Sequence, residues 1–247
     1  MSARLRRCAA RDAGVSLVEM LVAIVILGLL GTVIMTSVIS TKRSVGNSQQ
    51  QTNINEEARL AINRMARELR QATSLLAVRN PDGTAYSPTA VTSVTFSADF
   101  DGDGCINGVA PTPTPSPAPT CVSANTNNLE VLTYCYDPAP TSQQLVLIPG
   151  TLTGSTCTQA GARPILAANV TSLQLSYRSN MYLYDSDGDG ITTWRELDAA
   201  AAPVGDQDDD INTGDLANID SVVLDLALLE GVHRQSYRTQ IDLRNLS

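Results

Sequence analysis

Residues 14–34 read GVSLVEMLVAIVILGLLGTVI, and Glu19 is the only charged residue in this stretch. The apolar run continues to residue 39, which gives 25 residues from residue 15 onward with Glu19 still the single charge. A helix of that length would extend about 37 Å, enough to cross the roughly 30 Å hydrocarbon layer of a bilayer. Because a carboxylate within that layer costs about 2.5–3.5 kcal/mol, we expect Glu19 to have a partner or a specific role.

The charged residues are distributed unevenly on the two sides of this run. Residues 1–14 contain four arginines and one aspartate, whereas the remaining chain holds 13 basic and 24 acidic residues. Basic flanks remain on the cytoplasmic side of a membrane, so we expect everything after the apolar run to lie outside the cytoplasm. The acidity of that exported part argues against nucleic-acid binding through a general basic field.

The cysteines are consistent with export. Cys8 precedes the apolar run, while Cys105, Cys121, Cys135 and Cys157 follow it. Four cysteines in an oxidising compartment predict two disulfides, with three possible pairings. We favour the neighbouring pairs, Cys105–Cys121 and Cys135–Cys157, and the first would contribute about 3 kcal/mol by closing its loop. Free buried thiols are the alternative.

Three interpretations compete for residues 1–39. A secretory signal would have a shorter apolar core followed by an A-x-A-like cleavage site, and the sequence ISTKR at 39–43 offers no such site. A plain membrane anchor explains the length of the run but not Glu19. The third interpretation accounts for a short basic leader, for Gly14 directly before the run, and for a glutamate five residues after that glycine.

This pattern resembles the type IV prepilin signal. In that family a membrane aspartyl peptidase cuts after the glycine on the cytoplasmic side, and the new N-terminus is methylated. The resemblance implies cleavage between Gly14 and Val15, where Val15 replaces the family's usual phenylalanine. It also implies that Glu19, the fifth residue of the mature chain, faces the N-terminal amine of a neighbouring subunit in a filament core. Such a pairing offsets the burial of both charges and fixes the axial register.

A second helical pattern follows the apolar run. In INEEARLAINRMARELRQA (54–72) apolar residues recur at spacings of three and four, which predicts an amphipathic helix. We expect one helix from residue 15 to about residue 78, weakened at Gly28, Gly31 and Gly46 and ended by NPDG at 80–83. The predicted organisation is a leader (1–14), a transmembrane and filament-core helix (15–41), its amphipathic continuation (42–79) and an exported β-rich head (80–247).

The head is predicted to be an antiparallel sheet. Alternating or β-branched runs occupy 91–96, 129–136, 143–148, 170–178, 219–230 and 236–246. Short connections favour antiparallel pairing, so the fold class is α+β, with the long N-terminal helix packed on the sheet as in pilins. The segment VAPTPTPSPAPT (109–120) predicts a polyproline-like surface loop.

Beyond the leader the chain is similar to PilW-type minor pilins, relatives of the J-type pseudopilins of type II secretion. The segments that carry this similarity are ARLAINRMARELRQA (58–72), VTFSADFDGDG (94–104) and QIDLRNL (240–246). The resemblance implies a low-abundance subunit that primes assembly and sits near the tip of a type IV pilus. Because Glu19 is present, we expect another subunit above it.

The resemblance also implies partners and a location. The partners are other minor and major pilins, bound through the N-terminal helix, together with the prepilin peptidase and the inner membrane; no nucleic acid is expected. The protein would be a single-pass inner-membrane protein that then enters a pilus at the cell surface. Alternative functions are a pseudopilin of a type II secretion or DNA-uptake system, and a calcium-dependent tip adhesin.

The segment DSDGDGITTWRE (185–196) matches the twelve-residue calcium loop. Aspartates stand at positions 1, 3 and 5, a glycine at position 6 and a glutamate at position 12, and alternating carboxylates supply the hard oxygens that Ca²⁺ requires. The predicted ligands are Asp185, Asp187, Asp189, the Ile191 carbonyl, Thr193 and Glu196. A solvated acidic turn is the alternative.

Two further acidic loops are weaker candidates. DFDGDG (99–104) repeats the first half of the pattern with Asp99, Asp101 and Asp103, but its twelfth position is an alanine; an acidic hairpin turn is the alternative. GDQDDDINTGD (205–215) contains Asp206, Asp208 and Asp210 but has Ile211 where the pattern requires a glycine. We interpret it as a solvated loop that could lend a ligand to the main site.

The sequence offers little support for catalysis. Its only histidine is His233, and neither a Gly-x-Ser-x-Gly elbow nor a phosphate-binding loop is present. The cysteines are better explained as disulfides. We therefore predict a structural protein with no catalytic residues.

Overall fold

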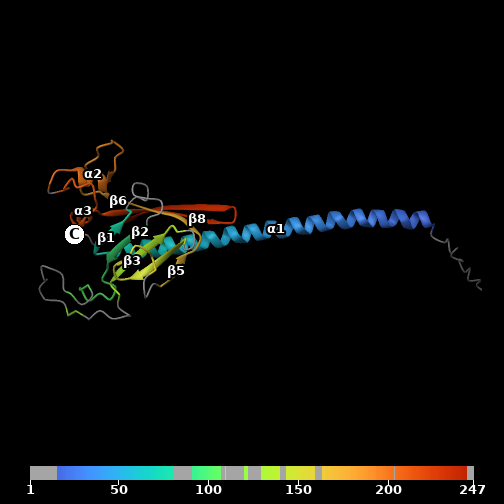
Figure 1. Cartoon of the computed structure of the whole chain (residues 1–247), viewed down its shortest axis with the longest axis horizontal. Helices are drawn as coiled ribbons and strands as arrows, with labels where there is room; N and C mark the ends of the chain where they lie inside the picture. Colours follow the sequence, from blue (N-terminus) through green and yellow to red (C-terminus); the bar gives the residue numbers. More distant parts are fainter. Residues whose placement is uncertain are drawn as a thin grey trace, which may run out of the picture. The chain divides into compact units, whose positions relative to one another are not determined.

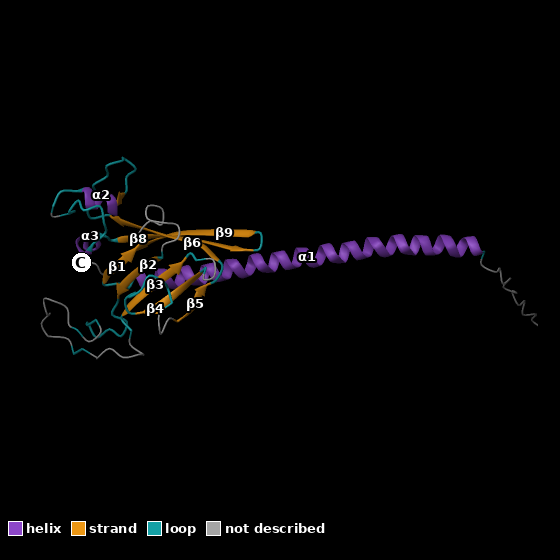
Figure 2. Ribbon diagram, in the orientation of Figure 1, coloured by secondary structure: helices purple, strands orange, loops and turns teal. Residues whose placement is uncertain are grey.

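The computed structural model describes residues 16–80, 91–106, 109, 120–121, 129–139, 143–158, 163–202 and 204–243. The chain divides into two compact units, Met1–Gln49 and Gln50–Ser247, which are described separately below. The long helix α1 (Leu17–Leu69) belongs to both units. Figures 1 and 2 show α1 and the strands of the second unit. The second unit is called the head.

In the first unit α1 exposes its apolar side chains along the whole described length. Gly28, Gly31 and Gly46 all lie inside the helix, so the predicted weak points do not interrupt it. The helix conformation satisfies the backbone hydrogen bonds internally. Among the described residues of this unit, nothing packs against the apolar part of the helix.

In the head, α1 buries one face and ends at Leu69. The buried residues are Ile54, Ala58, Ala61, Ile62, Met65, Ala66 and Leu69, as the spacing of apolar residues predicts. The prediction that the helix continues to about residue 78 was wrong, because residues from Ser74 onward form strand β1 (Ser74–Arg79). The helical periodicity stops at Ala72, and beyond it the backbone finds its hydrogen bonds in a sheet.

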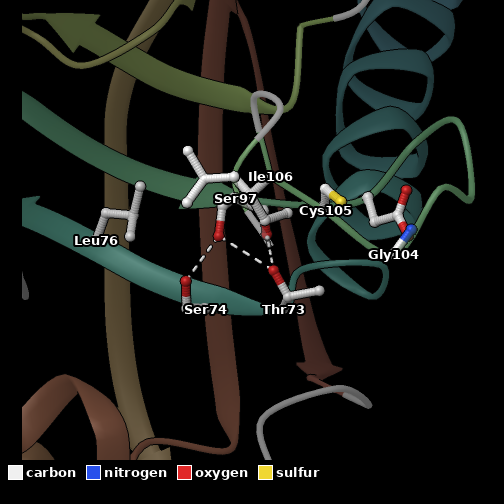
Figure 3. Close-up of a pocket in the computed structure, with 9 residues that line it drawn as sticks. Thr73, Ser74, Leu76, Ser97, Gly104, Cys105 and Ile106 are labelled. Carbon is white, nitrogen blue, oxygen red and sulfur yellow. Dashed lines mark hydrogen bonds between the residues drawn. The ribbon is translucent and has the colours of Figure 1, made fainter. Parts of the chain in front are cut away.

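Strand β1 pairs antiparallel with β2 (Thr92–Ser97), from Ser74 opposite Ser97 to Arg79 opposite Ser93. Polar contacts reinforce the start of this pair. The hydroxyls of Thr73 and Ser74 each share a hydrogen bond with the Ser97 hydroxyl, at 3.1 and 2.7 Å (Figure 3). The connection between helix and sheet is thus fixed at Thr73.

The first sheet has five antiparallel strands in sequence order, β1 to β5. The further strands are β3 (Val131–Asp137), β4 (Gln144–Pro149) and β5 (Arg163–Ala167). Strands β2, β3 and β4 match predicted segments to within two residues, whereas β1 and β5 were not predicted.

The second sheet has the order β7-β6-β8-β9. Its strands are β6 (Val170–Ser179), β7 (Thr192–Thr193), β8 (Ser221–Glu230) and β9 (His233–Asp242). Two short helices, α2 (Trp194–Ala199) and α3 (Thr213–Asn218), lie between β7 and β8 along the chain. The first acidic loop precedes β7, and the third lies between α2 and α3.

One hydrophobic cluster joins α1 to both sheets. It contains Ile54 and Met65 of the helix, Phe96 of the first sheet, and Tyr177 and Leu226 of the second, among others. Every member lies between Ile54 and Leu243, so the core is contained entirely in the head. The architecture is α+β, a long N-terminal helix followed by antiparallel sheets, as predicted.

Polar side chains of α1 also bind both sheets. The Tyr134 hydroxyl of β3 donates to the Glu68 carboxylate, which also accepts from Arg64. The Tyr237 hydroxyl of β9 donates to Asn55 at 2.7 Å. These pairs favour one arrangement of the elements over others, because a shift would break them and leave the buried Tyr134 hydroxyl without its partner.

Candidate functional site

Glu19 lies in the first turn of α1 and is exposed. The Ser16 carbonyl accepts the first backbone bonds of the helix, from the amides of Glu19 and Met20. Gly14 and Val15, where the leader is predicted to be cut, lie outside the described residues. Glu19 therefore stands at the beginning of the described helix, where a carboxylate is also favoured by the helix dipole.

Two threonines within the apolar run make internal hydrogen bonds. The hydroxyls of Thr32 and Thr36 donate to the carbonyls of Leu29 and Val33, at 2.8 and 2.9 Å. A hydroxyl that donates to a carbonyl one turn earlier has its hydrogen bond satisfied within the helix, so it can lie in an apolar environment at little cost. Among the described helices, α1 alone is long and apolar enough to cross a membrane by length and composition, which suggests membrane anchoring.

The first acidic loop is curled around Asp185. One oxygen of its carboxylate accepts from the amides of Gly188 and Asp189, at 2.7 and 3.1 Å, and the other accepts from Gly190 at 2.6 Å. Gly188 and Gly190 have positive φ, 78° and 82°, a conformation that glycine adopts without a steric cost. The curl brings oxygens of Asp185, Asp187 and Asp189 within 4.8 Å of one another.

Glu196, the predicted twelfth ligand, is not part of this group of carboxylates. One of its oxygens accepts from the amide and hydroxyl of Thr193, and the other accepts from those of Ser186. The bond from the Thr193 amide is one half of a capping box at the start of α2, in which the Thr193 side chain accepts from the Glu196 amide. Burial raises the pKa of Glu196, but these four hydrogen bonds outweigh it, so the pKa is lowered overall. In this arrangement Glu196 holds the two ends of the loop together.

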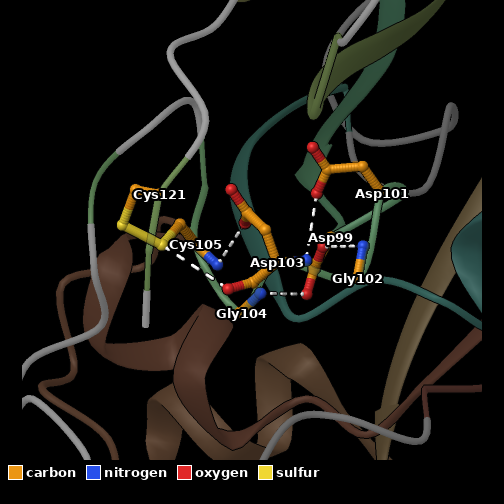
Figure 4. Close-up of a disulfide and its surroundings, with 7 residues drawn as sticks. All are labelled: Asp99, Asp101, Gly102, Asp103, Gly104, Cys105 and Cys121. Atoms are coloured by element: carbon orange, nitrogen blue, oxygen red, sulfur yellow. Dashed lines mark hydrogen bonds between the residues drawn. A yellow bond between two sulfur atoms is a disulfide. The ribbon is translucent and has the colours of Figure 1, made fainter. Parts of the chain in front are cut away.

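The second acidic loop repeats the curl of the first (Figure 4). The Asp99 carboxylate accepts from the amides of Gly102 and Gly104, at 2.7 and 2.9 Å. The equivalent bonds of Asp185 go to Gly188 and Gly190. Both glycines of the second loop again have positive φ. The two loops therefore share one backbone arrangement, although only the first has the full motif in sequence.

A fourth carboxylate that the sequence did not indicate joins the second loop. Glu130 lies directly before β3 and is 1% exposed, and its side chain groups with Asp99, Asp101 and Asp103 within 4.8 Å. The pairing of β2 with β3 brings it there, since the Ala98 amide donates to the Glu130 carbonyl at 2.8 Å. The predicted twelfth position, Ala110, lies outside the described residues. The structure thus supplies an acid from a different strand.

The third acidic loop forms its own group. Asp206 and Asp208 lie within 4.8 Å of Asp198 and Asp215, and the last two are buried. The structure groups Asp206 and Asp208 with residues of α2 and α3 and not with the aspartates of the first loop. Burial raises the pKa of both Asp198 and Asp215. In contrast, a hydrogen bond from Asn212 lowers the pKa of Asp206.

All three groups offer only carboxylate oxygens as side-chain donors. Hard divalent cations such as Ca²⁺ and Mg²⁺ prefer these ligands, whereas transition metals favour imidazole or thiolate. The donor sets therefore fit a hard cation, and the acidic clusters could bind a metal ion.

An open pocket of about 550 Å³ lies beside the second loop. Its described lining is Thr73, Ser74, Leu76, Ser97, Asp99, Gly104, Cys105, Ile106 and Val109. The lining is largely apolar, and its hydroxyls are already hydrogen-bonded to one another (Figure 3). Among its described lining residues, no nucleophile stands beside a general base.

Two disulfides stabilise the head. Cys105 is joined to Cys121 and Cys135 to Cys157, each with a Cα–Cα distance of 5.6 Å. These are the neighbouring pairs favoured from the sequence. Cys105 directly follows the second acidic loop (Figure 4), so this disulfide fixes one end of that loop.

A family model described as the prokaryotic N-terminal methylation motif matches residues 9–35. No curated protein and no solved structure matches the chain. The matched segment covers the basic leader, Gly14 and Glu19.

The chain thus carries a prepilin-like N-terminus ahead of a long apolar helix and antiparallel sheets. This combination indicates a type IV pilin-like or pseudopilin-like protein, and it suggests a structural subunit and not an enzyme.

Proposed function

We propose that the protein is a minor pilin of the PilW type, which primes assembly of a type IV pilus and is incorporated near its tip. The observation that carries this proposal is the match at residues 9–35, followed by an exposed apolar helix with Glu19 in its first turn. An unpartnered apolar surface of this length needs a membrane or other helices to cover it.

Glu19 is the proposed assembly residue. After cleavage between Gly14 and Val15, its carboxylate would lie near the N-terminal amine of a neighbouring subunit. In a low-dielectric bundle of helices the two charges offset each other's burial, whereas an unpaired carboxylate would be strongly unfavourable. This pairing would select the axial position at which a subunit enters the filament.

The proposal also includes a head stabilised by Ca²⁺. The ligands in the first loop would come from Asp185, Asp187 and Asp189, together with the Ile191 carbonyl. Thr193 and Glu196 would join them only after giving up the hydrogen bonds between them. Asp99, Asp101 and Asp103 would form a second site, which Glu130 completes. Extracellular loops of this kind bind with dissociation constants of about 10⁻⁴–10⁻³ M, so the ion would act as a structural staple.

N-terminal analysis of the protein from cells with and without the prepilin peptidase tests the proposal. We expect the mature chain to begin at Val15 only when the peptidase is present. Retention of the first fourteen residues in both strains would refute the filament function.

Glu19→Ala should leave membrane insertion intact and reduce the amount of protein found in sheared filaments. Glu56→Gln, which changes an exposed carboxylate of the head, is the control.

The same N-terminus would serve a pseudopilin of a type II secretion or DNA-uptake system. Detection of the protein in sheared surface pili favours the pilus, whereas loss of protein secretion or DNA uptake on deletion, with pili unchanged, favours the alternative. Chelator-sensitive binding of the protein to surfaces or glycans would instead indicate a tip adhesin.

A further inference from the structure

The outer edge of β9 has no hydrogen-bonding partner among the described residues. Strand β9 is the last in the order β7-β6-β8-β9 and pairs with β8 alone (Figure 2). The register of this pair runs from Glu230 opposite His233 to Ser221 opposite Asp242 without a bulge. No described residue makes a further backbone hydrogen bond with β9. Every second residue of β9 therefore directs its amide and carbonyl away from the sheet.

The direction of these groups follows from a bond on the far side of β8. The Leu229 amide donates at 2.9 Å to the carbonyl of Asn169, which directly precedes β6. Because Leu229 directs its amide to β6, it exchanges no hydrogen bonds with its β9 partner Arg234, whose amide and carbonyl point outward. Alternation repeats this direction at every second residue. The outward residues are Arg234, Ser236, Arg238 and Gln240, and their side chains are exposed as well. Their backbone groups are called the β9 edge.

The three other edges of the described sheets are irregular, short or partly covered. Strands β1 and β5 each have an irregular register with their neighbour, and the Glu57 carboxylate accepts from the Ala168 amide at the end of β5. Strand β7 has two residues. Bulges and short strands hinder the addition of a further strand. In contrast, β9 has ten residues and contains neither proline nor glycine, so it is the edge best suited to pairing.

The side chains on the inner face of β9 are incompletely covered. Tyr237 and Thr239 are half-buried, whereas their β8 partners Leu226 and Leu224 are completely buried. A further strand with apolar residues at alternate positions would extend this layer and cover both side chains. The inner face thus favours a partner segment with that alternation.

An extended segment is the occupant that this edge fits. A row of alternating amides and carbonyls is matched by the backbone of another strand, and pockets for alternate side chains supply the specificity. Charge gives no preference, since Arg238 lies opposite Asp225 and Arg234 lies near Glu230. Recognition therefore depends on backbone hydrogen bonds and on the apolar alternation.

We propose that the β9 edge binds an extended segment of a different prepilin-type subunit. The segment adds a strand to the four-stranded second sheet, and its apolar side chains cover Tyr237 and Thr239. This inference deepens the proposed function and rests on it, because a minor subunit lies beside subunits other than its own copies. The strand pairing names the surface through which such a neighbour is held.

Photocrosslinking in the cells that produce the filament tests the partner. The full-length chain carries p-benzoylphenylalanine in place of Arg238, between two outward residues of β9. After irradiation we expect a product whose linked peptides, identified by mass spectrometry, come from β9 and from an extended segment of another protein with a prepilin N-terminus. A product between two copies of this chain, or no product with such a protein, overturns the proposal.

Proline variants of the β9 edge provide the second measurement. A proline at position 236 removes an outward amide and hinders pairing there, without breaking a bond to β8. Ser236→Pro should lower the yield of the cross-linked product by roughly five-fold, the loss expected for one net hydrogen bond. Ser236→Ala keeps the amide and should retain the product. Equal yields for these two variants overturn the proposal.

Melting curves of the purified full-length variants test the direction of the amides. Ser236→Pro and Gln240→Pro should melt as the corresponding alanine variants do. Thr239→Pro removes an amide of the β8–β9 pair and should lower the melting temperature. If proline were equally destabilising at all three positions, the edge would not be free and the proposal would fail.

The N-terminus of the chain separates this inference from the proposed function. If the mature chain begins at Val15 and the cross-link is absent, the strand pairing alone is wrong. If the leader is retained in the presence of the peptidase, the proposed function is wrong and the partner class fails with it.

Discussion

The hydroxyl of Tyr134 in β3 donates a 2.5 Å hydrogen bond to the carboxylate of Glu68 in α1. This bond connects the middle of the first sheet to the last turns of the helix, at a point where Tyr134 is completely buried. Burial, and then the neighbouring Glu68 carboxylate, raise the pKa of Tyr134 far above its usual value. The tyrosine therefore stays protonated and remains a donor.

Tyr134→Phe should destabilise the head by about 1 kcal/mol, because the partly buried Glu68 carboxylate loses one of its two side-chain donors. The measurement is urea unfolding of the protein followed by near-UV circular dichroism. Tyr177→Phe is the matched control, since the Tyr177 hydroxyl is also buried but has no hydrogen-bond partner among the described residues. The control should be neutral or stabilising. Equal losses for both variants would contradict the role of the Tyr134–Glu68 bond.

Calcium should raise the melting temperature of the head. At a ligand concentration 100-fold above the dissociation constant, linkage contributes about 2.7 kcal/mol. Asp185→Asn should reduce the part of this gain that comes from the first loop, and Glu130→Gln the part from the second. Glu56→Gln makes the same change of charge far from the clusters and should keep the full gain. Identical melting curves with Ca²⁺ and with chelator would exclude a structural calcium role.

Asp198 and Glu196 should give opposite pH dependences without metal. The pKa of Asp198 is raised by burial, so its stabilising contribution is complete below its ordinary pKa of 3.8 and is lost as the pH rises through the folded pKa. The pKa of Glu196 is lowered, so its contribution is present above its ordinary pKa of 4.5 and is lost as the pH falls through the folded pKa.

Melting curves of metal-free variants between pH 4 and 7 would test this difference. Asp198→Asn should be more stable than the unmodified protein at pH 7, with the advantage shrinking toward pH 4. Glu196→Gln should be less stable at pH 7 by about 1 kcal/mol, because a neutral amide has one acceptor oxygen in place of two and accepts hydrogen bonds less strongly than a carboxylate, and the deficit should shrink as the pH falls. If the difference in melting temperature between each variant and the unmodified protein were the same at every pH, neither pKa shift would be supported.

Gly205→Ala should destabilise the head by about 2 kcal/mol or more. A Cβ atom at Gly205 would collide with the backbone carbonyls of Leu197 and Asp198, which cannot move without disturbing α2. Gly154→Ala is the control, because its nearest neighbour would be the Thr156 amide nitrogen at 4.0 Å. Thermal unfolding of both variants measures this difference. If the Gly205 variant were as stable as the control, Gly205 would not lie close to the carbonyls of Leu197 and Asp198.

The sequence predicted those features that depend on local patterns. The spacing of apolar residues identified the buried face of α1, and the D-x-D-x-D-G pattern identified two loops in which glycine adopts positive φ. It missed β1, because the segment SLLAVR becomes a strand only by pairing with β2. It also missed Glu130, which reaches the second acidic loop through the register of β2 and β3. Both depend on contacts between distant segments, which no local window contains.

The threonine hydroxyls of the apolar helix have one more consequence. The hydroxyls of Thr32, Thr36 and Thr41 donate to carbonyls of the same helix. Transfer of this segment from a lipid bilayer to a bundle of apolar helices therefore breaks none of these hydrogen bonds. Glu19 is the charged residue of this segment, and it must exchange its solvation for a new neighbour. The preference of the segment for a bilayer or for a bundle of helices therefore depends strongly on this carboxylate.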